Sequence, residues 1–134
     1  MIRPVFVTVT TTMNDQSKLQ ITENQQGGVT VLTLAGELTL DDGDLAFGRY
    51  VDQMVTAGQR QIVVDLSQVR YIDSAGVGML VAESKRVSQG GGAMRLARLT
   101  ARSHHLLAML KLKLVFEIYD DIESAVRSFA WRPQ

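Results

Sequence analysis

Apolar residues recur along the chain at two spacings, and the shorter spacing predicts the strands. β-branched runs lie on either side of residues 25–28, whose two glycines supply the positive φ angles that a hairpin turn requires. The first two strands are therefore expected to pair antiparallel. A continuous apolar run farther along indicates a strand that is covered on both faces. The predicted strands are residues 19–24, 29–38, 61–66, 93–97 and 114–118.

The longer, helical spacing fills most of the segments between these strands. The predicted helices are residues 40–57, with Gly58 just past the end, and 74–87, 101–110 and 120–130. Thr100 is expected to cap the third helix. The faces expected to lie against the sheet are Phe47, Tyr50, Val51, Met54 and Val55 in the first helix and Ile122, Ala125, Val126 and Phe129 in the last. Strands that alternate with helices after an opening hairpin predict an α/β domain with a mostly parallel sheet and about four helices.

The two ends of the chain depart from this pattern. Residues 1–18 are polar and rich in threonine, so we expect a flexible N-terminal extension. The alternative is an edge strand, because Val5, Val7 and Val9 alternate along the chain. The domain itself is expected to span residues 19–130, followed by a short tail at 131–134.

Composition narrows the class of protein. With 134 residues, 46% of them apolar, the chain is long enough for one domain with its own core. Cysteine is absent, which excludes disulfides, a thiol nucleophile and a thiolate zinc site. Fourteen basic and fourteen acidic residues balance, which argues against a nucleic-acid-binding protein. No apolar run approaches the roughly 20 residues of a membrane span, and no signal peptide is evident, so we expect a cytoplasmic protein without membrane insertion.

The candidate chemistry lies where the strand at 61–66 leads into the second helix, in the segment "IDSAGVGM". Asp73 and Ser74 fall at the helix N-terminus, where either residue could serve as the N-cap. Capping alone does not explain Gly76 and Gly78, because each glycine costs a helix up to about 1 kcal/mol relative to alanine. Small residues here allow another backbone to approach, which is either the protein's own sheet or the surface of a partner.

The helical wheel of this second helix separates a buried face from an outward face. The buried face is predicted to be Val77, Leu80, Val81, Ser84 and Val87, and the outward face Ala75, Met79, Ala82, Glu83 and Arg86. Methionine is common at surfaces that bind partners, so we interpret Met79, next to Ser74 and Gly76, as part of a docking surface.

Enzymatic alternatives are poorly supported by the residues. A nucleophile elbow requires glycine two residues before the serine, and Ile72 stands there. His104 and His105 are adjacent, so at most one of them could face Ser74 from a helix. A dinucleotide fingerprint would need a third glycine where Val81 stands. We therefore expect no catalytic residues, no cofactor and no metal.

Four blocks of the sequence resemble a known family: "GELTLDDGDL", "IVVDLSQVRYIDSAGVGMLV", "GGAMRLARLT" and "LKLVFEIYDDIESAV". They look like successive blocks of a STAS domain of the bacterial anti-sigma factor antagonist type, and the resemblance covers roughly residues 19–130. It implies that Ser74 is phosphorylated by a serine kinase that is also the anti-sigma factor. The unphosphorylated form would bind the kinase and release a sigma factor, and a serine phosphatase would restore that form.

One position departs from the family pattern. Members commonly carry an acid directly after "GEL", where this chain has Thr39, and Asp41 or Asp42 are the candidates to replace it. The departure leaves room for relatives that use the fold as a scaffold, in stress-signalling assemblies or lipid-transport ABC complexes. Whether the chain forms a homodimer stays open. The candidate partner-binding residues are Thr39, Asp41, Asp42, Asp73, Ser74, Ala75, Gly76, Gly78 and Met79.

Overall fold

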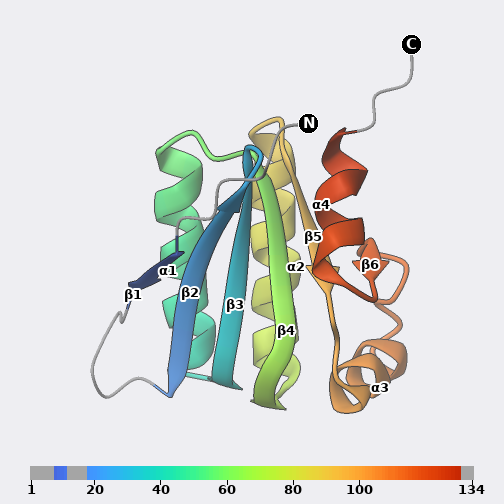
Figure 1. Ribbon diagram of the computed structural model, residues 1–134. Helices are drawn as coiled ribbons and strands as arrows, with labels where there is room; N and C mark the ends of the chain where they lie inside the picture. Colours follow the sequence, from blue (N-terminus) through green and yellow to red (C-terminus); the bar gives the residue numbers. More distant parts are fainter. Residues whose placement is uncertain (1–7, 12–17, 131–134) are drawn as a thin grey trace.

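The computed structural model describes residues 8–11 and 18–130, which form a six-stranded sheet flanked by four helices (Figure 1). The strands are β1 (Thr8–Thr11), β2 (Leu19–Gln26), β3 (Val29–Leu38), β4 (Gln61–Ile72), β5 (Ala93–Ala97) and β6 (Ile118–Tyr119). The helices are α1 (Gly43–Thr56), α2 (Ser74–Gln89), α3 (Ala101–Met109) and α4 (Ile122–Ala130). Strand order in space follows strand order in the sequence.

The pairing of the strands confirms the predicted fold class. β2 and β3 pair antiparallel, and the turn between them places Gly27 and Gly28 at φ angles of 56° and 84°. β3, β4, β5 and β6 are all parallel to one another. The glycine pair is needed because both residues lie in the left-handed region that other residues adopt at a cost.

Several predicted boundaries were wrong, and three of them change the element assignment at the start of the chain, at the first helix and near residue 116. Residues 8–11 form β1, which pairs antiparallel with β2, so the edge-strand alternative holds for these four residues and the tail does not. The rest of 1–18 and the tail at 131–134 lie outside the described residues. The first helix begins at Gly43, because Asp41 has a φ of 70° that a helix does not accommodate. Of the strand predicted at 114–118, only Ile118 is in β6, because the chain first turns to bury Phe116.

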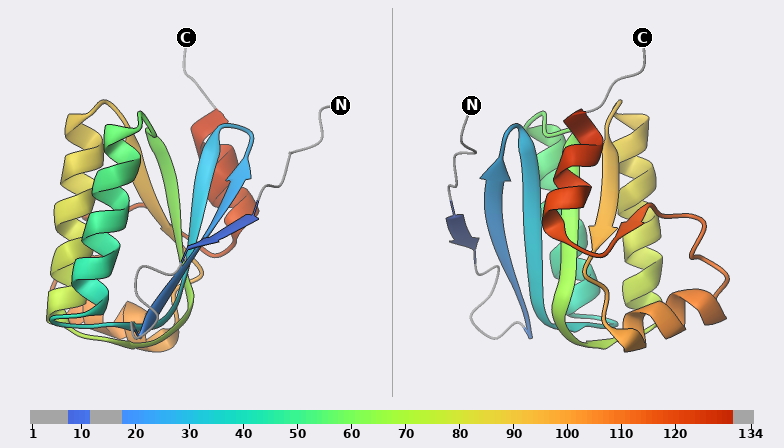
Figure 2. Two further views of the ribbon diagram at one scale, coloured as in Figure 1. Left: turned by 90° about the vertical axis from the view of Figure 1, so that its left-hand side faces the viewer. Right: turned by 45° about the vertical axis from the view of Figure 1, so that its right-hand side comes forward.

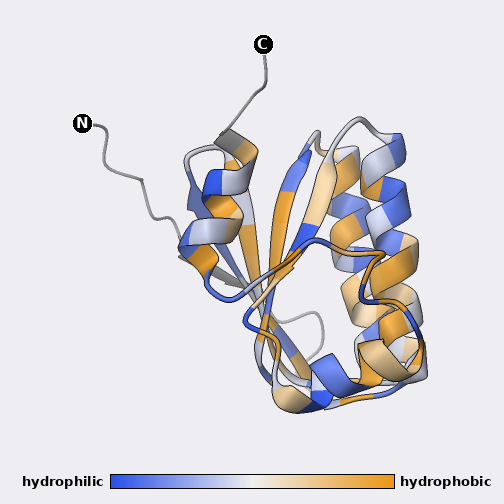
Figure 3. Cartoon of the chain, turned by 90° about the vertical axis from the view of Figure 1, so that its right-hand side faces the viewer, coloured by the Kyte–Doolittle hydropathy of each residue, from blue (hydrophilic) through white to orange (hydrophobic). Residues whose placement is uncertain are grey.

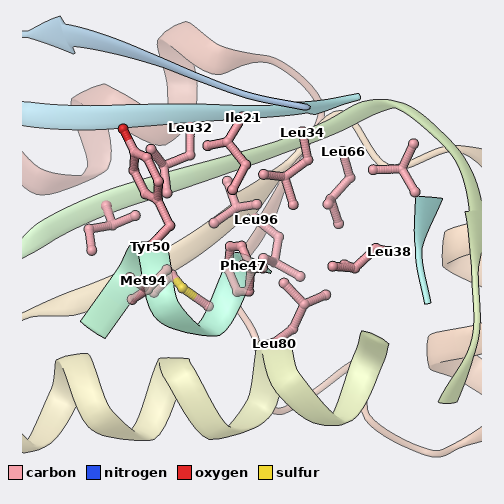
Figure 4. Packing of buried hydrophobic residues seen from close by; sticks show 14 of the residues in the cluster. Ile21, Leu32, Leu34, Leu38, Phe47, Tyr50, Leu66, Leu80, Met94 and Leu96 are labelled. Atoms are coloured by element: carbon pink, nitrogen blue, oxygen red, sulfur yellow. The ribbon is translucent and has the colours of Figure 1, made fainter. Parts of the chain in front are cut away.

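The helices cover the two faces of the sheet unequally. α1 and α2 lie side by side on one face, and α4 lies on the other (Figure 2). In the larger core, Phe47 of α1 and Leu80 of α2 point toward the leucines of the sheet (Figure 4). The smaller core lies under α4 and includes the expected inward residues Ala125, Ile122, Val126 and Phe129.

Glu83 corrects the predicted outward face of α2. Its side chain is buried, with 6% of the residue exposed, because α1 covers this flank of α2. Burial, followed by the hydrogen bond and the charge of Asp52, raises the pKa of Glu83 from 4.5 to about 7. Arg86 acts in the opposite direction and also pairs with Asp52, with 2.9 Å between Nε and Oδ1.

This buried carboxyl predicts a stability that falls as the pH rises. Between the unfolded pKa of 4.5 and the folded pKa of about 7, the folded protein binds more protons than the unfolded chain, so each step up in pH favours unfolding. We expect a loss of about 1 kcal/mol between mildly acidic and mildly basic buffer, after allowing for screening by solvent and Arg86. The free energy of unfolding, measured by urea denaturation, should not fall with pH in Glu83→Gln. It should still fall in the control Glu123→Gln, which changes an exposed glutamate of α4. An unchanged pH dependence in Glu83→Gln would contradict the assignment.

Candidate functional site

The candidate site lies at the edge of the sheet where β3 and β4 end. The two strands are parallel, and Leu38 pairs with Ile72 at their last residues. β3 leads through residues 39–42 into α1, and β4 leads through Asp73 into α2, so both helices begin at this edge (Figure 1). The fold thereby brings together the two segments that the sequence singled out.

Asp73 joins these two segments through its carboxylate. Oδ1 accepts a hydrogen bond from the backbone N–H of Gly76 at 2.9 Å, which makes Asp73 the N-cap of α2. Oδ2 accepts a hydrogen bond from the backbone N–H of Leu40 at 3.0 Å. Ser74 is therefore the first residue of α2, and it is exposed. Its hydroxyl group is presented to solvent beside a helix start that a neighbouring carboxylate already caps.

The two glycines of α2 have different explanations. A Cβ atom on Gly76 would lie 2.0 Å from the carbonyl oxygen of Leu38, so this glycine lets α2 approach the end of β3. Gly76 is buried there, so the packing of α2 on β3 explains this glycine, and its contact with a partner stays a prediction. A Cβ on Gly78 would meet nothing within 4 Å, and Gly78 is exposed. Gly43 repeats the first arrangement at the start of α1, where a Cβ would lie 2.0 Å from the carbonyl oxygen of Glu37.

Met79 does not face outward as predicted. It is half-buried and packs against the larger core, and a Cβ on Gly48 would lie 2.9 Å from its sulfur. Met79 thus lies across Gly48, between α2 and α1. The helical wheel assigned Met79 to the wrong face because it assumes that a helix has one buried face, marked by one apolar stripe. α2 is covered on two sides, by the sheet and by α1.

Thr39 and the two acidic residues of the β3–α1 loop differ in their exposure. Thr39 is half-buried, and its carbonyl oxygen accepts a hydrogen bond from the Asp44 N–H at 3.1 Å. The carboxylate of Asp42 accepts a hydrogen bond from the Lys18 backbone N–H at 2.9 Å, which directs it toward β2. Asp41 is exposed. Of the two acids proposed to replace the family's usual residue, Asp41 is therefore the one presented to solvent.

Two exposed apolar residues near this edge were missed by the sequence reasoning. Leu40 lies in the β3–α1 loop, and Tyr71 lies two residues before Asp73 with the guanidinium of Arg102 at 5.7 Å from its ring centre. Leu40 could have been found, because it is a leucine in a loop directly after a strand. Tyr71 could not, because the strand predicted at 61–66 was too short, whereas β4 continues to Ile72. An exposed hydroxyl flanked by apolar side chains and an acid is suited to docking a protein.

Within residues 8–11 and 18–130, no group of three or more histidine, aspartate or glutamate side chains is arranged to hold a metal ion. None of the helices in this part of the chain has both the length and the hydropathy to cross a membrane.

Comparison with known proteins adds four findings. Residues 20–125 match the model of the STAS domain family. An anti-sigma F factor antagonist from Paenibacillus polymyxa is 30% identical over 109 residues, which cover 81% of this chain and 92% of that protein. The crystal structure of an anti-sigma factor antagonist from Mycobacterium paratuberculosis has a TM-score of 0.73 at 17% identity, covering 89% of this chain and 100% of that one. The phosphorylated form of the Bacillus cell fate determinant SpoIIAA has a TM-score of 0.60 at 14% identity, covering 92% and 99%. The last two similarities show the fold.

Proposed function

The chain belongs to the STAS domain family and is of the anti-sigma factor antagonist type, and we propose that phosphorylation of Ser74 switches its binding to an anti-sigma factor. In the unphosphorylated form, the edge formed by the β3–α1 loop and the start of α2 binds an anti-sigma serine kinase, and the sigma factor is released. The observation that carries the proposal is the exposed Ser74 hydroxyl at the first position of α2.

The chemistry of the switch resides in the partner. The kinase transfers the γ-phosphoryl group of ATP to Oγ of Ser74, whose proton is lost, and ADP leaves. A phosphoserine carries about −1.5 to −2 charges at pH 7. The domain tolerates this charge at the helix N-terminus, but a partner that packs over Ser74 must desolvate it, which is expensive. The phosphorylated SpoIIAA structure supports the idea that this fold accommodates the modification. A serine phosphatase then restores the binding form by hydrolysis.

The modification is tested by mass spectrometry with the native partner. Proteins that co-purify with this chain are identified, and the recovered kinase is incubated with the chain and ATP. We expect one added phosphate in the wild type and in Ser88→Ala, which changes an exposed serine at the other end of α2, and none in Ser74→Ala. Phosphate on Thr39 or Ser67 in place of Ser74 would overturn the site. Recovery of a transporter ATPase and permease would favour the lipid-transport scaffold.

A further inference from the structure

The last residue of α3 and the turn that follows it, residues 109–115 and together called the α3–β6 turn, expose an unusual amount of apolar surface. Its side chains Met109, Leu110, Leu114 and Val115 are all exposed, and Leu114 reaches 101% relative exposure. The turn lies on the side of the domain that carries α3 and β6, opposite β1 and α1 (Figure 1), and this side faces the viewer in Figure 3. Contiguous exposed apolar side chains of this kind mark interaction surfaces.

The turn is held in place by its own anchors. The Leu112 N–H donates to the Leu107 carbonyl oxygen at 2.8 Å, and the Val115 N–H donates to the Leu112 carbonyl oxygen at 3.0 Å. Leu107 and Phe116 are buried on either side of the turn, and Leu112 packs against the larger core. Leu114 therefore points into solvent from an ordered turn, because Leu107, Leu112 and Phe116 are the residues of this segment that pack into the core.

The charge of this part of the chain is one-sided. Residues 98–116 contain two arginines, two lysines and two histidines and no acid, in a chain whose net charge is zero. Lys111 and Lys113 are exposed and alternate with the leucines of the turn. The first carboxylate after it, Glu117, pairs with Arg95 at 3.2 Å. The turn thus combines exposed apolar side chains with two exposed amines.

From this combination we propose that the α3–β6 turn docks the protein peripherally on an anionic lipid bilayer. Leu114 and Val115 enter the headgroup region, and Lys111 and Lys113 extend their amines to the lipid phosphates while their stems cover apolar surface. Each lysine near an anionic membrane surface strengthens binding about fivefold. The contact is interfacial, so it needs no spanning helix.

The other occupants fit the turn less well. A second copy of the chain would place two basic turns against each other in a two-fold interface, where like charges repel. A protein partner would meet a surface of lysine, leucine and valine, although protein interfaces are depleted in lysine and their main binding residues are seldom leucine or valine. A lipid bilayer can accommodate a protruding turn without a groove of matching shape, which a protein partner would have to provide.

Vesicle flotation tests the proposal with the full chain. We expect wild type to float with vesicles of phosphatidylglycerol mixed with phosphatidylcholine at low salt, and to be released by high salt. Lys113→Glu should weaken binding at least fivefold, and so should the double variant Leu114→Ser with Val115→Ser. The matched controls Lys85→Glu on α2 and Leu45→Ser on α1 change an exposed lysine and an exposed leucine elsewhere, and they should bind as wild type does.

The proposal is overturned if wild type does not float, if it floats equally with phosphatidylcholine alone, or if the turn variants bind as wild type. It is also overturned if the turn variants lose binding to the anti-sigma partner while wild type ignores vesicles, because the turn would then be a protein interface. Circular dichroism of each variant checks that it is folded. Ser74→Ala should float normally, so this result does not depend on the proposed phosphorylation.

Discussion

Gly76→Ala is expected to destabilise the domain by about 3 kcal/mol, although alanine is the better helix former. The new Cβ would lie 2.0 Å from the Leu38 carbonyl oxygen and 3.0 Å from its carbonyl carbon, and both are backbone atoms that a rotamer change cannot move. Either α2 or the end of β3 must shift, and overpacking of this kind typically costs 1–3 kcal/mol or more. The loss outweighs the gain in helix propensity, which is at most about 1 kcal/mol.

Gly78→Ala is the matched control, two residues farther along the same helix. Its Cβ would meet nothing within 4 Å, so the substitution should stabilise the domain by up to about 1 kcal/mol. Urea denaturation of both variants measures the difference. Equal stabilities would show that α2 does not pack on β3 as described, and a destabilised Gly78→Ala would show that this position is not open.

Ser74→Asp is expected to weaken binding to the anti-sigma kinase at least tenfold, equivalent to about 1.4 kcal/mol, with little change in stability. The carboxylate stands at the positive end of α2, but Asp73 already occupies the cap, so the free energy of unfolding should change by less than about 0.5 kcal/mol. In the complex the added charge is desolvated against a surface that accepts a neutral hydroxyl, and that cost is not compensated.

The control for this prediction is Ser88→Asp, which adds the same charge at the far end of α2. Isothermal titration with the purified kinase should give wild-type affinity for Ser88→Asp and a weaker one for Ser74→Asp. Wild-type affinity in Ser74→Asp would reject the phosphorylation switch and favour a constitutive scaffold.

The fold was predictable from the sequence because its signals are local. The glycine pair at 27–28, the apolar run that begins β4 and the spacing of Ile122, Ala125 and Phe129 each depend on a few neighbouring residues. The segment 114–118 was misread because an apolar run of that length fits a strand or an exposed turn with one buried residue equally well. Only the packing of Phe116 decides between them.

The candidate site was predictable in part. The position of Asp73 and Ser74 at the helix start follows from the strand-to-helix junction, although either residue could have been the N-cap. The second hydrogen bond of Asp73, to Leu40, spans 33 residues and leaves no local trace in the sequence. Met79 and Glu83 were assigned to the wrong face because a helical wheel describes one helix, whereas their surroundings come from α1. Gly76 and Gly78 look alike in the sequence. They differ only in the folded domain, where the end of β3 lies against Gly76 and not against Gly78.

The two glycines pressed onto the end of β3, Gly43 and Gly76, have a consequence for the kinetics of docking. Backbone contacts this close leave the starts of α1 and α2 little room to move relative to the sheet. A preorganised surface loses little conformational entropy when a partner binds. We therefore expect slow amide hydrogen exchange, before the partner arrives, at Gly76 and Asp44, whose N–H groups donate to the Asp73 carboxylate and the Thr39 carbonyl oxygen. Substitutions on this surface should then change the lifetime of the complex more than the rate at which it forms.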